Sequence, residues 1–286
     1  MPSLSDIKRR IRSVKNTQQI TKAMKLVSAS KLRKAQEAIL KARPYALKTR
    51  QMLNSLAGRC DVERHPFLKI RDENKILIFL ITADKGLCGG FNSSLIKQTM
   101  ETIRQKEGKE VELIIAGKKG NDIFQSRPYK ILQKHIGWTR ELSYDKTANI
   151  AETLGRLFVE GAVDKIYIVY NEFKSVLQQT VVTEQLLPIV PVQASEGQWL
   201  VDYVYEPDSD TILENLLRMY LEVEIYRAFL ESSASEHGAR MTAMDNATRN
   251  AKEMIGQLTL FYNKARQAYI TKELIEIVSG AEALKG

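Results

Sequence analysis

The two ends of the chain share a seven-residue pattern of apolar side chains, and this pattern constrains the fold more than any other feature. Apolar residues recur at alternating intervals of three and four over residues 3–57 and again over residues 208–286. Such spacing is typical of the seam along which the helices of a coiled coil pack. We therefore predict two long terminal helices, residues 1–60 and 208–286, that pair as an antiparallel coiled coil.

The seam of the first helix changes character near its middle. Over residues 18–28 the register falls on polar residues, and the apolar residues lie one position over, so the apolar face is expected to rotate toward a different neighbour. Pro44 is expected to bend the helix without necessarily ending it. The apolar seam consists of Leu4, Ile7, Ile11, Val14, Leu32, Ala35, Ile39, Ala42, Ala46, Leu53 and Leu56. The polar register positions are Gln18, Thr21, Lys25 and Ser28, and the displaced apolar residues are Ile20, Met24 and Val27.

The first sixty residues are strongly basic. They contain fifteen Lys or Arg and only two acidic residues, Asp6 and Glu37. Such an arm could bind nucleic acid, lie on a membrane or pair with a protein. Basic residues lie all round the helix and Tyr45 is the only aromatic residue before Phe67, which argues against nucleic acid. Small seam residues argue against a membrane surface. We expect protein contacts instead.

The second helix keeps one register over most of its length. Only Arg227, His237 and Thr248 interrupt it, and it is mildly acidic, so it can complement the basic helix. Because it is longer, its end, ITKELIEIVSGAEAL, is expected to project and to need apolar surroundings. The seam consists of Leu213, Leu216, Tyr220, Val223, Leu230, Ala234, Met241, Met244, Ala251, Ile255, Leu258, Tyr262, Ala265 and Tyr269, and then shifts to Ile270, Leu274, Ile277 and Ala281.

Residues 73–205 change period. Short apolar, β-branched runs at 75–82, 111–117, 129–135 and 164–170 alternate with helical stretches, which predicts a mostly parallel sheet with helices on its faces. The run at 175–189 follows the fourth strand after a short link, which allows an antiparallel partner but no crossover helix. The predicted fold class is therefore α/β, with a Rossmann-like domain inserted between the two helices of the coiled coil.

The loop after the first strand, TADKGLCGGFNSS (82–94), is rich in glycine. Its GxxGG spacing is neither the GxGxxG dinucleotide fingerprint nor a P-loop, and AGKKG at 116–120 also lacks the P-loop pattern. A tight turn between a strand and a helix needs such glycines in any case. We expect no nucleotide, and no other cofactor, to bind here.

Other catalytic chemistry finds no support in the residue spacing. His65, His135 and His237 are far apart and join no metal-ligand cluster, and no nucleophile elbow is present. Two cysteines, Cys60 and Cys88, favour a reducing compartment over a disulfide framework. The chain also has no membrane-spanning run of apolar residues and no secretory signal. We expect a cytosolic-side protein without catalytic or metal-binding residues of its own.

Specific segments at both ends of the chain carry a family resemblance. The stretch IKRRIRSVKNTQQITKAMKLVSASKLRKAQ (7–36) closely resembles the start of the gamma subunit of F-type ATP synthases. The segments SEHGARMTAMDNATRNA (235–251) and YNKARQAYITKELIEIVSGAEAL (262–284) resemble the end of the same family, and DKGLCGGFN (84–92) is also typical of it. The chain is thereby identified as a member of that family over its whole length.

The resemblance implies a central rotor shaft. In that family the two terminal helices enter a hexamer of alpha and beta subunits, and the α/β domain lies against the epsilon subunit and the c-ring. Proton-driven rotation of the ring is thereby coupled to ATP synthesis at the beta subunits, or ATP hydrolysis to proton pumping. The implied location is the cytoplasmic face of the bacterial inner membrane, because the cysteine pair of the chloroplast branch is missing. Neither nucleic acid nor direct membrane contact is implied.

Family roles fall on matching residues at both ends. Met24 and Lys25 resemble the segment that faces an acidic lever loop of the beta subunit. Further partner contacts are implied near the C-terminus, where four polar residues resemble contacts to beta-subunit loops and the segment from about Leu274 resembles a tip held in an apolar bearing. The residues with implied contacts are Arg266, Gln267, Thr271, Glu273, Leu274 and Ile277.

Two function classes remain open from the sequence. The first is a non-catalytic rotor component of the ATP synthase. The second is an α/β nucleotide-binding enzyme with helical arms, in which the loop containing Gly86 and Gly90 would bind ATP. Micromolar, loop-dependent binding of ATP by the purified chain would distinguish the second class from the first.

Overall fold

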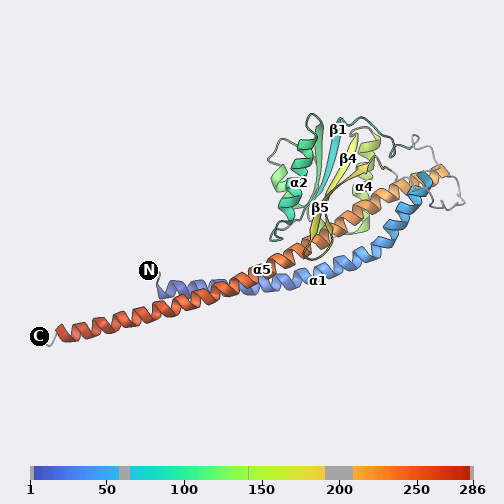
Figure 1. Cartoon of the computed structure of the whole chain (residues 1–286). Coiled ribbons are helices and arrows are strands. Elements are labelled where there is room, and N and C mark those ends of the chain that lie inside the picture. The colour runs from blue at the N-terminus through green and yellow to red at the C-terminus, as the bar shows by residue number, and fades with distance from the viewer. Residues whose placement is uncertain (1–2, 58–64, 141, 191–208, 284–286) are drawn as a thin grey trace. The chain divides into compact units, whose positions relative to one another are not determined.

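The protein is described by a computed structural model that covers residues 3–57, 65–140, 142–190 and 209–283 (Figure 1). The chain forms two compact units: one is Ser28–Arg240, and the other combines Met1–Val27 with Met241–Gly286. Two long helices run through both units, α1 (Leu4–Ala57) and α5 (Ser209–Ala283). Within each unit a stretch of α1 packs against a stretch of α5 that runs in the opposite direction (Figure 1).

The start of helix α1 and its passage through Pro44 both follow from the sequence. It begins at a serine cap, since the Ser3 hydroxyl accepts a hydrogen bond from the Asp6 amide (3.1 Å). The carboxylate of Asp6 lies in the first turn, where the positive end of the helix dipole stabilises it. Pro44 lies inside the helix, which continues to Ala57, so the proline does not end it.

The central domain is built on a five-stranded sheet in the order β3-β2-β1-β4-β5. The first four strands are parallel, and β5 pairs antiparallel with β4. This confirms the predicted sheet, including its antiparallel edge. The strands are β1 (Lys75–Ile81), β2 (Glu110–Ala116), β3 (Lys130–His135), β4 (Lys165–Phe173) and β5 (Gln179–Leu187).

Helices cover both faces of this sheet, as a buried parallel sheet requires. On one face α2 (Phe91–Gln105) and α3 (Lys118–Phe124) pack on a cluster that includes Ile78 and Leu113. On the other face lies α4 (Tyr144–Val159), which starts at the capping side chain of Ser143. A short 3-10 helix, Trp138–Arg140, precedes α4.

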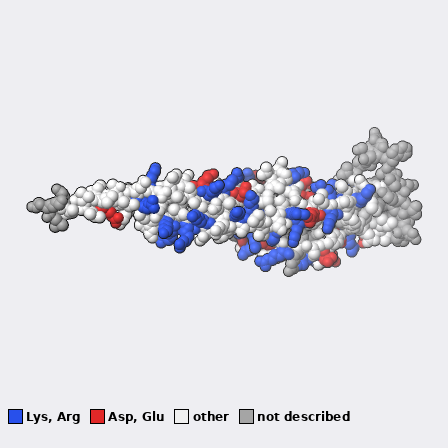
Figure 2. All heavy atoms as spheres, turned by 90° about the horizontal axis from the view of Figure 1, so that it is seen from below, with Lys and Arg blue, Asp and Glu red and all other residues white. Residues whose placement is uncertain are grey.

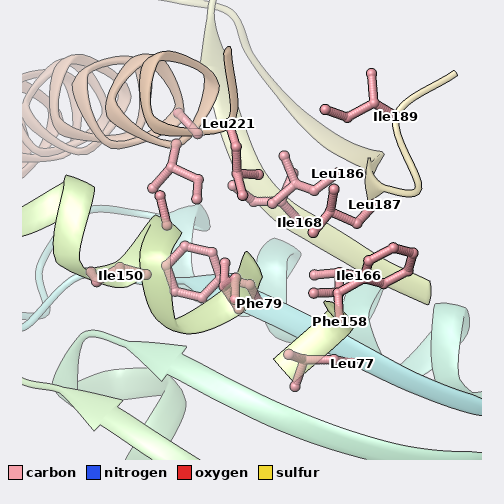
Figure 3. Packing of buried hydrophobic residues seen from close by; sticks show 14 of the residues in the cluster. Leu77, Phe79, Ile150, Phe158, Ile166, Ile168, Leu186, Leu187, Ile189 and Leu221 are labelled. Atoms are coloured by element: carbon pink, nitrogen blue, oxygen red, sulfur yellow. The ribbon is translucent and has the colours of Figure 1, made fainter. Parts of the chain in front are cut away.

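The larger hydrophobic core lies on the α4 face of the sheet (Figure 3). Phe79 and Ile168 of the sheet pack with Phe158 of α4, and all three are essentially inaccessible to solvent. Leu221 of α5 belongs to the same cluster. Each such side chain stabilises the fold by about 1.5–3 kcal/mol through burial.

The first part of α5 is therefore also part of the domain core. Leu217, Leu221 and Ile225 lie in the core cluster, although none of them belongs to the heptad seam expected from the sequence. No residue from Leu221 to Arg240 is exposed. The expectation of a single apolar seam was thus incomplete here, because this stretch of α5 packs against α1 and against the domain at the same time. The division of the chain into the segments 1–60, 73–205 and 208–286 stays a prediction.

Candidate functional site

The helix pair of the unit formed by residues 1–27 and 241–286 is held by polar residues at its centre. The hydroxyls of Thr21 and Thr248 share a hydrogen bond of 2.8 Å. One turn further along α1, the Lys25 ammonium lies 2.5 Å from the carboxylate of Asp245. The polar register positions of α1 therefore stay on the side that faces α5.

The ion pair between Lys25 and Asp245 is half-exposed, and it shifts the pKa of its acidic partner. The hydrogen bond from Lys25 is the largest of the effects that lower the pKa of Asp245 below its ordinary value. Each side chain is about 40% exposed, at 40% for Lys25 and 39% for Asp245. Solvent screens such a pair strongly, so its role is to set the register of the helices more than to stabilise them.

The apolar residues of the same stretch of α1 point away from α5. Ile20 is 60% exposed and Val27 is 58% exposed, while Met24 is half-buried. This agrees with the expected rotation of the apolar face. Of the two partner-contact residues predicted here, Lys25 binds Asp245 of the chain itself, and Met24 lies beside it at the edge of the exposed apolar face.

The C-terminal stretch of α5 is a single exposed helix, and the other predicted contact residues lie on it. Every residue from Arg266 to Ala281 is exposed. The polar residues make contacts within the helix, as in the hydrogen bond from the Thr271 hydroxyl to the Gln267 carbonyl (3.0 Å). The apolar residues include Leu274 and Ile277, which are 57% and 68% exposed.

This end of α5 continues past the beginning of α1 (Figure 1). Ile7 is the most deeply buried residue of α1 in this unit, at 2% exposure, while the half-buried residues of α5 end at Ala265. Figure 2 shows few charged side chains near that end, whereas Lys and Arg mix with Asp and Glu further along the same face. An apolar helix end without a partner in the described chain is a surface that needs a complementary socket.

Within the unit Ser28–Arg240, hydrogen bonds join α5 to the C-terminal end of β4. The Ser235 hydroxyl donates to the Asn171 carbonyl (3.2 Å), and the Ser232 hydroxyl accepts from the Asn171 amide (3.4 Å). Glu231 accepts from the Phe173 amide at 2.9 Å. These bonds satisfy backbone groups of β4 directly, so the strand and the helix behave as one rigid piece.

Arg227 extends this anchor to β5. Its guanidinium lies 2.7 Å from the carboxylate of Glu224 and 3.1 Å from that of Glu184. It also donates a hydrogen bond to the Tyr170 hydroxyl at 3.0 Å. The arginine that interrupts the heptad register is thus an anchor between α5 and two strands.

The glycine-rich loop after β1 is bound to α5 through its carbonyl oxygens. Arg240 donates to the carbonyls of Gly86 (3.2 Å) and Lys85 (3.3 Å), and its other nitrogen pairs with Glu236 at 2.7 Å. Glu236 and His237 are both buried. Burial, the largest effect, and the nearby Arg240 lower the pKa of His237 to about 4.

The carboxylate of Asp84 in that loop is also used within the fold. Asp84 accepts hydrogen bonds from the Lys118 amide (3.1 Å), the Gly137 amide (2.9 Å) and the Thr139 hydroxyl (2.9 Å). A side chain at Gly117 would place its Cβ 2.0 Å from the Thr82 carbonyl oxygen. Gly117, the first glycine of AGKKG, is therefore required by close packing of the backbone, so no phosphate ligand is needed to explain it.

Metal-binding chemistry finds no cluster in the described ranges. That part of the chain contains no group of three or more His, Cys, Asp or Glu side chains that could hold a metal ion. Cys88 is buried and burial raises the pKa of its thiol, which makes it a poor nucleophile. Cys60 lies outside the described residues. None of the described helices is long and apolar enough to cross a membrane.

The sequence did not predict the residues of α5 that bond to α1 and to the sheet. Asp245 and Thr248 face the polar register positions of α1, and Glu231 and Ser232 hold the sheet. A signal for them existed in part, since polar residues that break a heptad pattern often have a specific partner. The partners themselves lie more than fifty residues away in the sequence, so spacing could not identify them.

Three comparisons with known proteins agree on one family. The family model described as ATP synthase matches residues 3–284. The ATP synthase gamma chain of Geobacter metallireducens is 48% identical over 288 residues, and that of Chlorobaculum parvum is 46% identical over 291 residues. Both alignments cover 100% of this chain and 100% of the relative.

Solved structures give the same result. The central stalk and c-ring structure of the Tetrahymena thermophila mitochondrial ATP synthase contains a chain that is 26% identical, with a TM-score of 0.61 over 80% of this chain and 99% of that one. A rotor chain of the Euglena gracilis enzyme, 20% identical, shares the fold with a TM-score of 0.65 over 93% of this chain and 98% of that one. The chain belongs to the ATP synthase gamma chain family.

Proposed function

We propose that the chain is the central-stalk rotor subunit of an F-type ATP synthase. It couples proton-driven rotation of the c-ring to ATP synthesis at the beta subunits, and in reverse couples ATP hydrolysis to proton pumping. Family membership over the full length supports the role, as does the likeness to a chain of a solved central stalk. The chain itself is a component of the enzyme and contributes no catalytic residue.

The observation that carries this proposal is the exposed C-terminal stretch of α5. It presents large apolar side chains to solvent over several turns, including Leu274, Ile277 and Val278, which are 57%, 68% and 65% exposed. Helices with apolar residues on their open surface are marginal in water unless a partner covers them. A socket formed by the alpha and beta subunits would bury these apolar residues. The polar side chains of the same stretch would contact the opening of that socket.

The partner contacts follow from where the side chains lie. Met24 and Lys25 are assigned to the beta subunits; Met24 lies at the edge of the exposed apolar face of α1, and Lys25 is 40% exposed beside its partner Asp245. Along α5, Arg266 and Gln267 with Thr271 and Glu273 are assigned to beta-subunit loops, and Leu274 and Ile277 to the apolar bearing. All six α5 residues are exposed, as contacts with other subunits require.

The α/β domain is assigned to the epsilon subunit and the c-ring. Its rigid attachment to α5, through Arg227 and the bonds to β4, supports this, since torque applied to the domain must reach the helix without slip. The complex then holds the chain at the cytoplasmic face of the bacterial inner membrane as a peripheral subunit. Neither a cofactor nor nucleic acid takes part in this role.

Co-purification tests the assignment to the complex. When the tagged chain is expressed with alpha and beta subunits, we expect it to be recovered with three copies of each per copy of the chain. The stoichiometry is measured by native mass spectrometry. Recovery of the chain alone, or with ATP bound to the loop around Gly86, would support the nucleotide-binding enzyme instead.

A charge placed at Met24 tests the contact with the beta subunits. Met24→Lys adds a cation beside Lys25. This cation should bind the acidic lever loop of the beta subunit and hold the shaft to that loop. We expect ATP-driven proton pumping in membrane vesicles to fall while assembly survives. Leu47→Lys is the matched control on α1, since Leu47 is 56% exposed and has no assigned contact. Equal pumping in both variants would contradict the placement of Met24.

A further inference from the structure

A cavity of about 390 Å³ opens between α1, α5 and the start of α4. All of its lining residues lie within the unit Ser28–Arg240. Ile39 and Ala46 come from α1, Tyr144 from α4, and Val223 and Leu230 from α5. Volumes of 300–1,000 Å³ with mainly apolar and aromatic walls are typical of small-molecule sites in proteins.

The aromatic walls of the cavity are held in place by hydrogen bonds outside it. Tyr144 donates to the carboxylate of Glu222 (2.8 Å), and Tyr45 contacts the Met219 sulfur through its hydroxyl (2.8 Å). The rings of Tyr144 and Tyr226 meet edge to face, with centroids 5.6 Å apart and planes at 79°. Two aromatic surfaces at nearly a right angle form a corner that suits a flat ring.

The charged residues of the lining are Glu231, Arg227 and the exposed Arg43. Arg227 uses its guanidinium on Glu184, Glu224 and Tyr170, so it is already neutralised. Glu231 is only 5% exposed, and one of its oxygens accepts the Phe173 amide. A buried carboxyl at an otherwise apolar wall favours a ligand that offers it a hydrogen-bond donor.

We propose that this cavity binds an uncharged aromatic compound of two or three rings that donates one hydrogen bond to Glu231. An apolar cavity of about 150 Å³ holds one benzene molecule, so the larger volume here accommodates two or three rings. A charged ligand would lose its hydration against walls that are mostly apolar. The site is independent of the rotor function, and its occupant would link α1, α4 and α5.

A helix from a partner protein is a poorer fit to the same space. A helix with its side chains is about 10–12 Å across and would need an open groove several turns long. The cavity instead is lined by residues of three helices. A single side chain from a partner remains the competing occupant, and the experiment below separates it from a small molecule.

The test uses the purified full-length chain and N-phenyl-1-naphthylamine, an uncharged three-ring probe with one N–H donor whose fluorescence rises in apolar surroundings. We expect saturable binding at one site per chain with a micromolar Kd. 1-Benzylnaphthalene, which has a CH₂ group in place of the N–H, should compete at least threefold more weakly. Equal affinity of the two compounds would overturn the role given to Glu231.

Variants of α1 locate the site. Ala46→Phe fills the cavity from a half-buried position and should weaken binding of the probe at least tenfold. Leu40→Phe adds the same ring at a residue of α1 that is 64% exposed, and should leave binding within twofold of the unmodified chain. Unchanged binding in a folded Ala46→Phe variant would overturn the proposal, as would the absence of saturable binding to the unmodified chain.

Two measurements need no variant at all. Hydrogen–deuterium exchange of the unmodified chain should slow over residues 39–46 and 223–231 when the probe is saturating, and protection elsewhere alone would overturn the site. The titration is then repeated on the assembly with alpha, beta and epsilon subunits. Retained binding supports a small-molecule site, whereas loss of binding on assembly would assign the cavity to a partner side chain and overturn the proposal.

Discussion

At the scale of single residues, the polar side chains that interrupt the heptad patterns are the ones with specific partners. Arg227 holds two strands, and Thr248 meets Thr21 across the helix pair. His237 lies beside Arg240, which binds the loop after β1. Such residues lower the stability of a seam in exchange for a unique register, as single polar residues do in coiled coils.

His237 makes the stability of the unit Ser28–Arg240 depend on pH. Its folded pKa of about 4 lies below the ordinary value of 6.5, so the folded state excludes the proton. The stability that depends on neutral His237 is present above pH 6.5 and is lost as the pH falls toward 4. Because Glu231 and Glu236 have pKa values raised by burial and act in the opposite sense, the comparison must be made between variants.

We therefore expect His237→Gln to reduce the loss of stability between pH 7 and pH 5 by about 2 kcal/mol. The measurement is urea unfolding of both proteins at the two pH values, followed by tryptophan fluorescence. Trp138 packs in the domain core and reports the transition. A pH dependence that is the same in both proteins would show that the histidine is not held neutral.

A pair of glycine substitutions tests the close packing around β1. Gly117 has a φ of +96°, and its Cβ would lie 2.0 Å from the Thr82 carbonyl oxygen, so Gly117→Ala should destabilise the domain by about 3 kcal/mol or more. Gly256 lies inside α5 with open space around it, and Gly256→Ala should stabilise the helix by up to about 1 kcal/mol. Thermal unfolding of the two variants checks both signs. A neutral Gly117→Ala would mean that the strand ends have room to separate.

At the scale of elements, α5 changes its role along its length. Its first part is a core helix of the α/β domain, its middle is one helix of a helix pair, and its last turns are open to solvent. The same helix therefore contains residues of every degree of burial. The consequence is a gradient of mutational sensitivity along a single element.

Two leucines on α5 measure this gradient. Leu217 is fully buried in the domain core, and Leu217→Ala should cost about 2–5 kcal/mol of unfolding free energy. Leu260 is 66% exposed, and Leu260→Ala should change stability by less than about 0.5 kcal/mol. Denaturant midpoints of the two variants give the comparison. Similar costs at both residues would mean that Leu260 is covered in the chain on its own.

The sequence alone was sufficient for the elements and insufficient for their docking. Period and composition predicted both long helices and all five strands, because a seam such as Leu32 to Ile39 and a run such as 75–82 bury a repeating face. The second apolar face of α5, with Leu217 and Leu221, was missed because a helix buried on most sides has no single period. The partners of Lys25 and Arg227 were missed because ion pairs between distant segments leave no mark in spacing.

At the scale of the whole molecule, the chain is a rotor whose fold and contacts are separable. The α/β domain and the helices that pack on it are held by a core of their own. The exposed end of α5 adds nothing to that core, since every residue from Arg266 to Ala281 is exposed. Its side chains are therefore free to serve contacts with other subunits.

Removing residues 277–286 separates the two functions. We expect the truncated chain to keep its thermal unfolding temperature within a few degrees, because residues 277–281 are all exposed. The assembled complex should lose part of its ATP-driven proton pumping, because the tip no longer fills its bearing. Circular dichroism and vesicle acidification measure the two effects. Unfolding of the α/β domain in the truncated chain would contradict this separation.

Rotation itself is the most direct test of the central claim. A bead is attached to a cysteine at Leu177, which is 84% exposed on the α/β domain, in a chain that also carries Cys60→Ser, and the chain is assembled with alpha and beta subunits fixed to a surface. If the chain is the rotor, the bead turns in one direction in three equal steps per revolution when ATP is added. ATP hydrolysis by the same complexes with a bead that does not rotate would contradict the account.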